Sequence, residues 1–139
     1  MKLRLTPIVQ QLRQAGAKSV EGLLEFSKQA TAPRLLPAYF VVPTKEGAQP
    51  NRLSGARDQK VDVGFSVIIV LEGRQRRPDL VAEDLSEAIN FVVDALVGWT
   101  HPEASAPVDY AGGELLSADG TTVEWRVGLT ARYHLRKAT

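Results

Sequence analysis

The stretch Val123–Leu135 (VEWRVGLTARYHL) decides the fold of this chain. Its apolar residues occupy every second position, and the positions between them hold polar residues, charged residues or glycine. Because side chains of a β-strand point alternately to opposite faces, this alternation predicts one long strand with a buried face and a solvent-exposed face. At roughly 3.3 Å per residue the strand would span about 43 Å, more than the diameter of about 37 Å expected for a compact domain of this length. We therefore expect the strand to bend at Gly128 or to extend beyond the core.

The rest of the chain divides into shorter helices and strands. A second alternating run, Val61–Leu71, predicts another long strand, and Ile68 and Val70 on its opposite face indicate that its later half is covered on both sides. Proline, glycine and capping residues mark the ends of the other elements. These are a helix from Thr6, its N-cap, to Gly16; a short helix from about Ser19; a strand at Ala38–Val42; a helix from Asp79, its N-cap, to Leu96; and a strand from about Val108 to Ser117.

This order predicts the α+β class, with about four strands in an antiparallel or mixed sheet and helices packed on one face. The length of 139 residues fits a single domain, residues 1–139. Within it, the polar stretch Thr44–Gln59 is predicted to be a long loop. Loops of that length are usually functional or disordered, so we expect this one to become ordered when it meets a partner.

Ala118-Asp119-Gly120 signals a hairpin turn between the last two strands. A two-residue turn would set Leu116 opposite Val123. A three-residue loop with Gly120 in the left-handed conformation would instead set Leu115 opposite Val123 and Gly113 opposite Trp125. We prefer the second register, because it lets the indole ring of Trp125 lie over a bare glycine.

Composition excludes several classes of protein and site. The chain has no cysteine and a formal net charge of +1, which excludes disulfides and thiolate metal sites and gives no support for bulk electrostatic binding of nucleic acid. No apolar run approaches the roughly 20 residues of a membrane span. Met1–Leu5 lacks the features of a signal peptide. We expect a soluble cytoplasmic protein without a membrane partner.

No set of residues suits catalysis or cofactor binding. His101 and His134 are isolated in the sequence and are interpreted as surface residues, not metal ligands. The carboxylates from Asp79 to Asp94 fit a helix start and a solvated helix face. The sequence therefore predicts no enzyme, no catalytic residue, no metal site and no cofactor.

Arginines are the charged residues most suited to contact a partner. Arg74, Arg76 and Arg77 form a basic turn, and the arginines of the last strand share its polar face, so a small nucleic-acid-binding module is one hypothesis. The other hypothesis is an interface with a protein partner or with further copies of the chain. The candidate residues for this interface are Arg52, Arg57, Arg74, Arg76, Arg77, Arg126, Arg132 and Arg136.

The order and spacing of several segments resemble a known family. These segments are PAYFVVP (37–43), NRL (51–53), LVGW (96–99) followed by Pro102, VDYAGGELL (108–116), VEW (123–125) and TARYHLR (130–136). Together they are similar to the small tail-terminator-like, or tail-completion, proteins of long-tailed bacteriophages and prophages, from about Thr6 to Arg136.

The resemblance implies a structural virion protein with an α+β sandwich fold and no catalytic residues. Such a protein would cap the head-proximal end of the tail tube as a hexameric ring, end tail elongation and offer the surface for head attachment. Its partners would be further copies of itself, the tail tube protein below and a head-completion or connector protein above. The genome DNA would pass through the ring without sequence-specific binding, and assembly would occur in the bacterial host cytoplasm. Another neck, connector or minor tail protein is the alternative.

Overall fold

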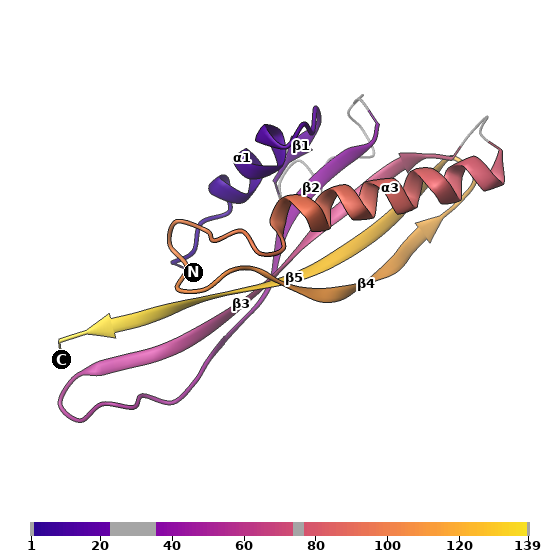
Figure 1. Cartoon of the computed structure of the whole chain (residues 1–139). Coiled ribbons are helices and arrows are strands. Elements are labelled where there is room, and N and C mark those ends of the chain that lie inside the picture. The colour runs from indigo at the N-terminus through magenta and orange to yellow at the C-terminus, as the bar shows by residue number, and fades with distance from the viewer. Residues whose placement is uncertain (1, 23–35, 74–76, 139) are drawn as a thin grey trace.

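A computed structural model describes residues 2–22, 36–73 and 77–138 of the chain. The described residues form one five-stranded sheet of order β1-β2-β3-β5-β4 and two helices (Figure 1). Strand β1 is parallel to β2, and every other neighbouring pair is antiparallel, so the sheet is mixed and the predicted α+β class is confirmed. The elements are α1 (Thr6–Gln14), β1 (Val20–Glu21), β2 (Ala38–Ala48), β3 (Arg57–Glu72), α3 (Pro78–Leu96), β4 (Asp109–Ala118) and β5 (Thr122–Lys137).

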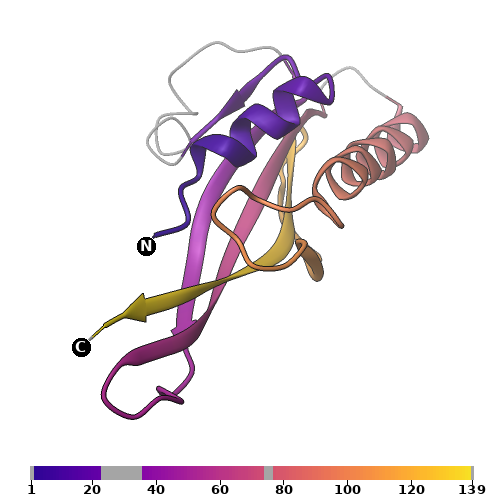
Figure 2. The same cartoon turned by 60° about the vertical axis from the view of Figure 1, so that its left-hand side comes forward.

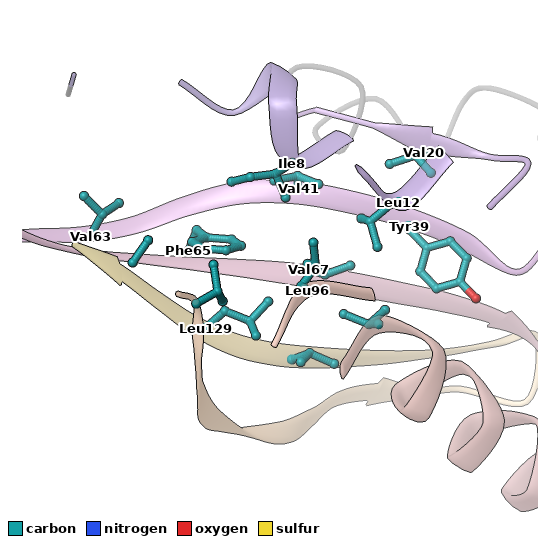
Figure 3. Packing of buried hydrophobic residues seen from close by; sticks show 14 of the residues in the cluster. Ile8, Leu12, Val20, Tyr39, Val41, Val63, Phe65, Val67, Leu96 and Leu129 are labelled. Carbon is teal, nitrogen blue, oxygen red and sulfur yellow. The ribbon is translucent and has the colours of Figure 1, made fainter. Parts of the chain in front are cut away.

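Both helices cover the same face of the sheet, as predicted (Figures 1 and 2). The odd-numbered residues of β3 and β5 point to this face, and their partners come from α1, α3 and β2. Phe65, Val67 and Leu129 are at most 1% exposed and lie near the centre of this cluster (Figure 3). The alternation in the sequence therefore identified the buried face of both long strands.

A second, smaller cluster lies on the opposite face of the sheet. Phe40 of β2 stands opposite Ile68 of β3, and Ala38 stands opposite Val70. All four residues are buried. This confirms that the later half of β3 is covered on both sides.

The long strands extend past the helices and end in a projecting tip (Figures 1 and 2). The arm tip consists of residues 49–59 of the β2–β3 hairpin and residues 134–138, which include the end of β5 and the residue after it. Arg57 pairs with Lys137 and Asp58 with Arg136, so the hairpin and the end of β5 are joined there. The expectation that the last strand extends beyond the core is confirmed.

Both predicted boundaries of the loop Thr44–Gln59 are wrong, and the loop is shorter than expected. Strand β2 continues to Ala48 and β3 begins at Arg57, so only residues 49–56 connect them. A register shift between Pro43 and Lys45 lets β2 continue after the proline, which has no N–H for a ladder and is tolerated at bulges and edges. The polar composition reflects exposure of these strand residues and not the absence of a strand.

The predicted short helix near the N-terminus needs correction. Val20 and Glu21 form β1 and pair with Tyr39 and Phe40, so no helix begins at Ser19; the rest of the predicted short helix lies outside the described residues. The carbonyl of Ser19 accepts a hydrogen bond from Tyr39 N at 2.8 Å, which extends this pairing. Tertiary pairing has overridden the local helical pattern.

The predicted helix caps are each displaced by one or two residues. Helix α1 has Leu5 as its N-cap, and α3 has Arg77, neither with a side-chain cap. In both helices a proline occupies one of the first two helical positions, where its missing N–H costs nothing. The prolines, and not Thr6 or Asp79, determine where these helices begin.

The β4–β5 turn confirms one part of its prediction. Gly120 has a φ of 84° and is left-handed as expected. Both predicted registers are wrong, because Ala118 stands opposite Val123 and Leu115 opposite Trp125. The carboxylate of Asp119 accepts hydrogen bonds from Thr121 N at 2.9 Å and Thr122 N at 3.0 Å, inside the turn that joins the two strands.

Trp125 nevertheless lies over Gly113. A Cβ atom on Gly113 would come within 2.7 Å of the indole Nε1. The contact is diagonal across the strands, because Gly113 stands opposite Val127. Trp125 is partly buried and packs against the main cluster.

Candidate assembly surfaces

The described residues contain no group of three or more His, Cys, Asp and Glu side chains placed to hold a metal ion. In the same residues, no helix is both long and apolar enough to cross a membrane. The surfaces suited to contact a partner are instead the arm tip and the outer edge of β4.

His101 is a buried structural residue, which corrects its interpretation as a surface residue. Its side chain is 0% exposed. Nδ1 accepts a hydrogen bond from Glu103 N at 2.9 Å, so the neutral ring donates from Nε2 to the carbonyl of Arg4 at 2.6 Å. This pair of bonds fastens the N-terminal segment to the loop after α3, and an ion pair of 2.8 Å between Arg4 and Glu103 adds to it.

The connection at the arm tip is held by the amide side chain of Asn51. Its Oδ1 accepts a hydrogen bond from Asp58 N at 2.7 Å, and its Nδ2 donates to the carbonyls of Leu53 and Ala56 at 2.8 and 2.9 Å. Asparagine commonly satisfies backbone groups of a turn in this way. The residues after β2 are therefore internally hydrogen-bonded without any partner protein.

Asp58 is the centre of charge at the arm tip. Arg52 donates two hydrogen bonds to its Oδ2, from Nε at 3.0 Å and from Nη2 at 2.7 Å. On the other side, Oδ1 lies 3.1 Å from His134 Nδ1 and 3.5 Å from Arg136 Nε. The hydrogen bonds from Arg52, and next the hydrogen bond with His134, lower the pKa of the Asp58 carboxyl to about 2. The carboxylate is thus ionised at neutral pH and neutralised by its neighbours.

The arginines of the polar sheet face also have partners within the chain. Arg126 contacts Glu114 at 2.9 Å, and Arg132 contacts Asp62 at 2.7 Å. With Arg136 beside Asp58, each of the three strand arginines lies next to a carboxylate. Alternating charges of this kind do not form the continuous positive surface that binding to a phosphate backbone requires, which weighs against the nucleic-acid-binding hypothesis.

The remaining candidate arginines are dispersed. Arg77 contacts Asp79 at 3.1 Å at the start of α3, where it is exposed. Arg57 lies at the arm tip with Arg52 and Arg136. Arg74 and Arg76 lie outside the described residues. The structure therefore brings together Arg52, Arg57 and Arg136 and places Arg77 at the opposite end of β3.

The edge strand β4 carries an exposed apolar patch that sequence reasoning missed. Tyr110, Leu115 and Leu116 are 50%, 54% and 44% exposed, and Leu53 at the arm tip is 48% exposed. Of the large apolar side chains that the structure describes, these four are the exposed ones. The one sequence signal was the pair Leu115-Leu116, which breaks the alternation expected of a strand with one dry face.

Comparison with known proteins gives a family and a fold. A family model described as "Phage tail terminator protein" matches residues 1–139. No curated protein matches the sequence. Among solved structures, a chain of the "Virion of native gene transfer agent (GTA) particle" is similar, with a TM-score of 0.54 and 14% identity. The similarity covers 91% of this chain and 90% of that chain, and at this identity it establishes a shared fold.

Proposed function

The chain belongs to the phage tail terminator family, and from this premise we propose that it caps the head-proximal end of the tail tube as a hexameric ring. Membership of the family makes the chain a structural protein of the virion tail. The proposal adds that ring formation stops tube elongation and creates the surface to which the filled head attaches. The match over residues 1–139 is the observation that carries the proposal, because it includes every described element of the fold.

The surface chemistry of the chain supports this function. The ring would act through shape and not through bond-making, in keeping with arginines and carboxylates that are neutralised within the chain. A near-neutral net charge of +1 suits a ring through which DNA must slide without being retained. The proposed partners are the tail tube protein on one side and a head-completion or connector protein on the other.

The function is tested by removing the gene from the phage or prophage and examining the particles by electron microscopy. A terminator is needed to end the tube, so its loss should give overlong tails and filled heads without tails. Complementation with the intact chain should restore tails of uniform length. Normal tail length and normal head joining in the deletion strain would contradict the proposal.

Binding experiments separate this function from that of a connector on the head side. The purified chain should bind isolated tail tubes and should not bind portal-bearing heads that lack tails. The reverse preference would assign the chain to the head side of the neck.

A further inference from the structure

We propose that the arm tip of one copy docks against the outer edge of β4 in the next copy, and that this contact closes the ring. The inference rests on the proposed function, because it specifies which surfaces join neighbouring subunits. The occupant of the β4 edge is therefore a second copy of this chain.

The outer edge of β4 is only partly protected against pairing with another chain. In the part of the chain that the structure describes, β4 pairs only with β5, so its other side has no strand partner. Its sequence, DYAGGELLSA, contains no lysine, arginine or proline, the residues with which proteins commonly block such edges. Two register shifts divide its ladder with β5, so side-chain contact is favoured over a long new ladder.

The exposed apolar side chains of β4 are suited to be buried by a partner. Tyr110, Leu115 and Leu116 are each close to half exposed. Large apolar side chains that lie exposed on the same strand indicate an interaction site. Aromatic rings such as that of Tyr110 are enriched in protein interfaces, because they combine apolar area with a hydroxyl group.

The arm tip offers a complementary surface. A hollow of about 290 Å³ is lined there by Leu53 and Ala56, with Arg57, Arg136 and Lys137 and the carboxylate of Asp58 around it. Asn51 and Asp58 already fix the surrounding backbone and side chains by hydrogen bonds. A surface that is ordered before binding loses less conformational entropy when its partner docks.

Charge favours the pairing of unlike surfaces. Strand β4 begins at Asp109 and is followed by Asp119, whereas the rim of the arm-tip hollow carries Arg57 and Lys137, besides Arg136, which faces Asp58. Two β4 edges facing each other would bring acidic residues together, and two arm tips would bring basic residues together. Like charges across an interface are unfavourable, so a contact between an arm tip and a β4 edge is selected.

The two surfaces are also placed as a ring requires. Trp125 of β5 stands opposite Leu115, and Arg136 of β5 stands opposite Asp58. At ~3.3 Å per residue the two positions lie about 36 Å apart along β5. Two different patches far apart on one subunit give head-to-tail contacts, which close into a ring when the rotation between copies permits it.

Cysteine cross-linking tests this contact directly, because the natural chain has no cysteine. One full-length variant carries Leu53→Cys at the arm tip and an affinity tag, and the other carries Leu115→Cys without a tag. The two are mixed on tail tubes and treated with a short bis-maleimide. The matched control replaces Leu115→Cys with Ser86→Cys, at an exposed position of α3.

The mixed sample should give a covalent dimer of tagged and untagged chains at about tenfold the yield of the control, because neighbours in a ring hold the two thiols at high effective concentration. Strong cross-linking of Leu115→Cys to itself would indicate two-fold pairing of β4 edges and overturn the inference. So would cross-linking to the tube protein in place of a second copy.

The failure of this inference differs from the failure of the proposed function. If rings form on tails but the dimer yield equals that of the control, the contact is wrong and the terminator function stands. If the chain neither associates with itself nor binds tails, both the proposed function and the proposed contact are wrong.

Discussion

The body of the sheet and the arm tip share the strands β3 and β5 but are held together by different interactions. In the body, apolar side chains such as Phe65, Val67 and Leu129 are 0–1% exposed beneath the helices (Figure 3). At the arm tip, a single layer of backbone is fastened by the amide of Asn51 and the carboxylate of Asp58. Apolar burial scales with the area removed from water, whereas a single hydrogen bond adds only about 0.5–1.5 kcal/mol to stability.

This difference separates stability from assembly within one sheet. The body determines whether the chain folds. The arm tip keeps its shape through local contacts, and its apolar Leu53 stays half exposed and available for contact. Changes in the two regions should therefore have separate consequences, for stability on the one hand and for association on the other.

The largest loss of stability is expected in the body. Replacement Phe65→Ala should lower the free energy of unfolding by about 3–5 kcal/mol, because it removes a fully buried ring and leaves a cavity. Urea denaturation followed by circular dichroism measures this loss. The matched arm-tip change Leu53→Ala should cost less than about 0.5 kcal/mol, as expected of an exposed side chain. Equal losses at the two positions would mean that the distinction between body and arm tip is false.

A smaller and local loss is expected at the arm tip. Replacement Asn51→Ala removes the acceptor of Asp58 N and the donor to the carbonyls of Leu53 and Ala56. The cost should be about 1–2 kcal/mol. Amide hydrogen exchange should become faster at residues 51–58 and stay unchanged at Val67 and Ile69. Faster exchange throughout the sheet would show that the arm tip and the body unfold as one unit.

Acid should affect the arm tip through Asp58. Its pKa is lowered to about 2, first by hydrogen bonds from Arg52 and then by the hydrogen bond with His134, with Arg136 also facing the carboxylate. A lowered pKa in the folded state means that the ionised group stabilises the fold. This contribution is complete above the unfolded value of about 3.9 and is lost as the pH falls through about 2.

NMR spectra recorded between pH 5 and pH 2 measure this effect. The signals of residues 51–58 should change with a midpoint near the lower end of that range. The variant Asp58→Asn has no carboxylate to be protonated at this position, so the same transition should be missing. Persistence of the transition in the variant would assign it to another carboxyl group, such as Glu103, whose pKa is also lowered, chiefly by its side-chain hydrogen bond with Arg4.

The smallest effect on folding is expected on the edge strand. Replacement Leu115→Glu should change the free energy of unfolding by less than about 0.5 kcal/mol, because the side chain is 54% exposed. The same change should abolish association with further copies, since it adds a charge to the apolar patch and to an already acidic edge. Sedimentation velocity of the variant and the natural chain at equal concentrations measures this. Unimpaired association would remove the edge of β4 from the interface.

Much of the body could be predicted from the sequence, because the alternation of apolar and polar residues along a strand indicates which face is buried. The two long strands were identified by residues such as Val67 and Val127, which are buried on the predicted face. Asp79 and Gly98 marked the ends of the long helix to within two residues of those of α3. The prediction of short elements was wrong where pairing with a distant strand determines the structure, as at Val20 in β1.

The arm tip and the edge patch were harder to predict for physical reasons. An exposed hairpin has the same polar composition as a loop. Residues such as Lys45 and Glu46 were therefore assigned to a loop, although they belong to β2. The ion pairs of Arg126 and Arg132 connect residues far apart in the chain and depend on strand register. The exposure of Leu115 depends on β4 lying at the edge, which follows from the strand order and not from the local sequence.

The most direct test of this account is the mass of the species that the chain forms on purified tails. Cross-linked and released material analysed by native mass spectrometry should show a closed hexamer of the 15.2 kDa subunit, with the smaller species disappearing as tails are added in excess of the chain. A chain that stays monomeric at every concentration, with and without tails, would contradict the claim that this protein works by assembling copies of itself.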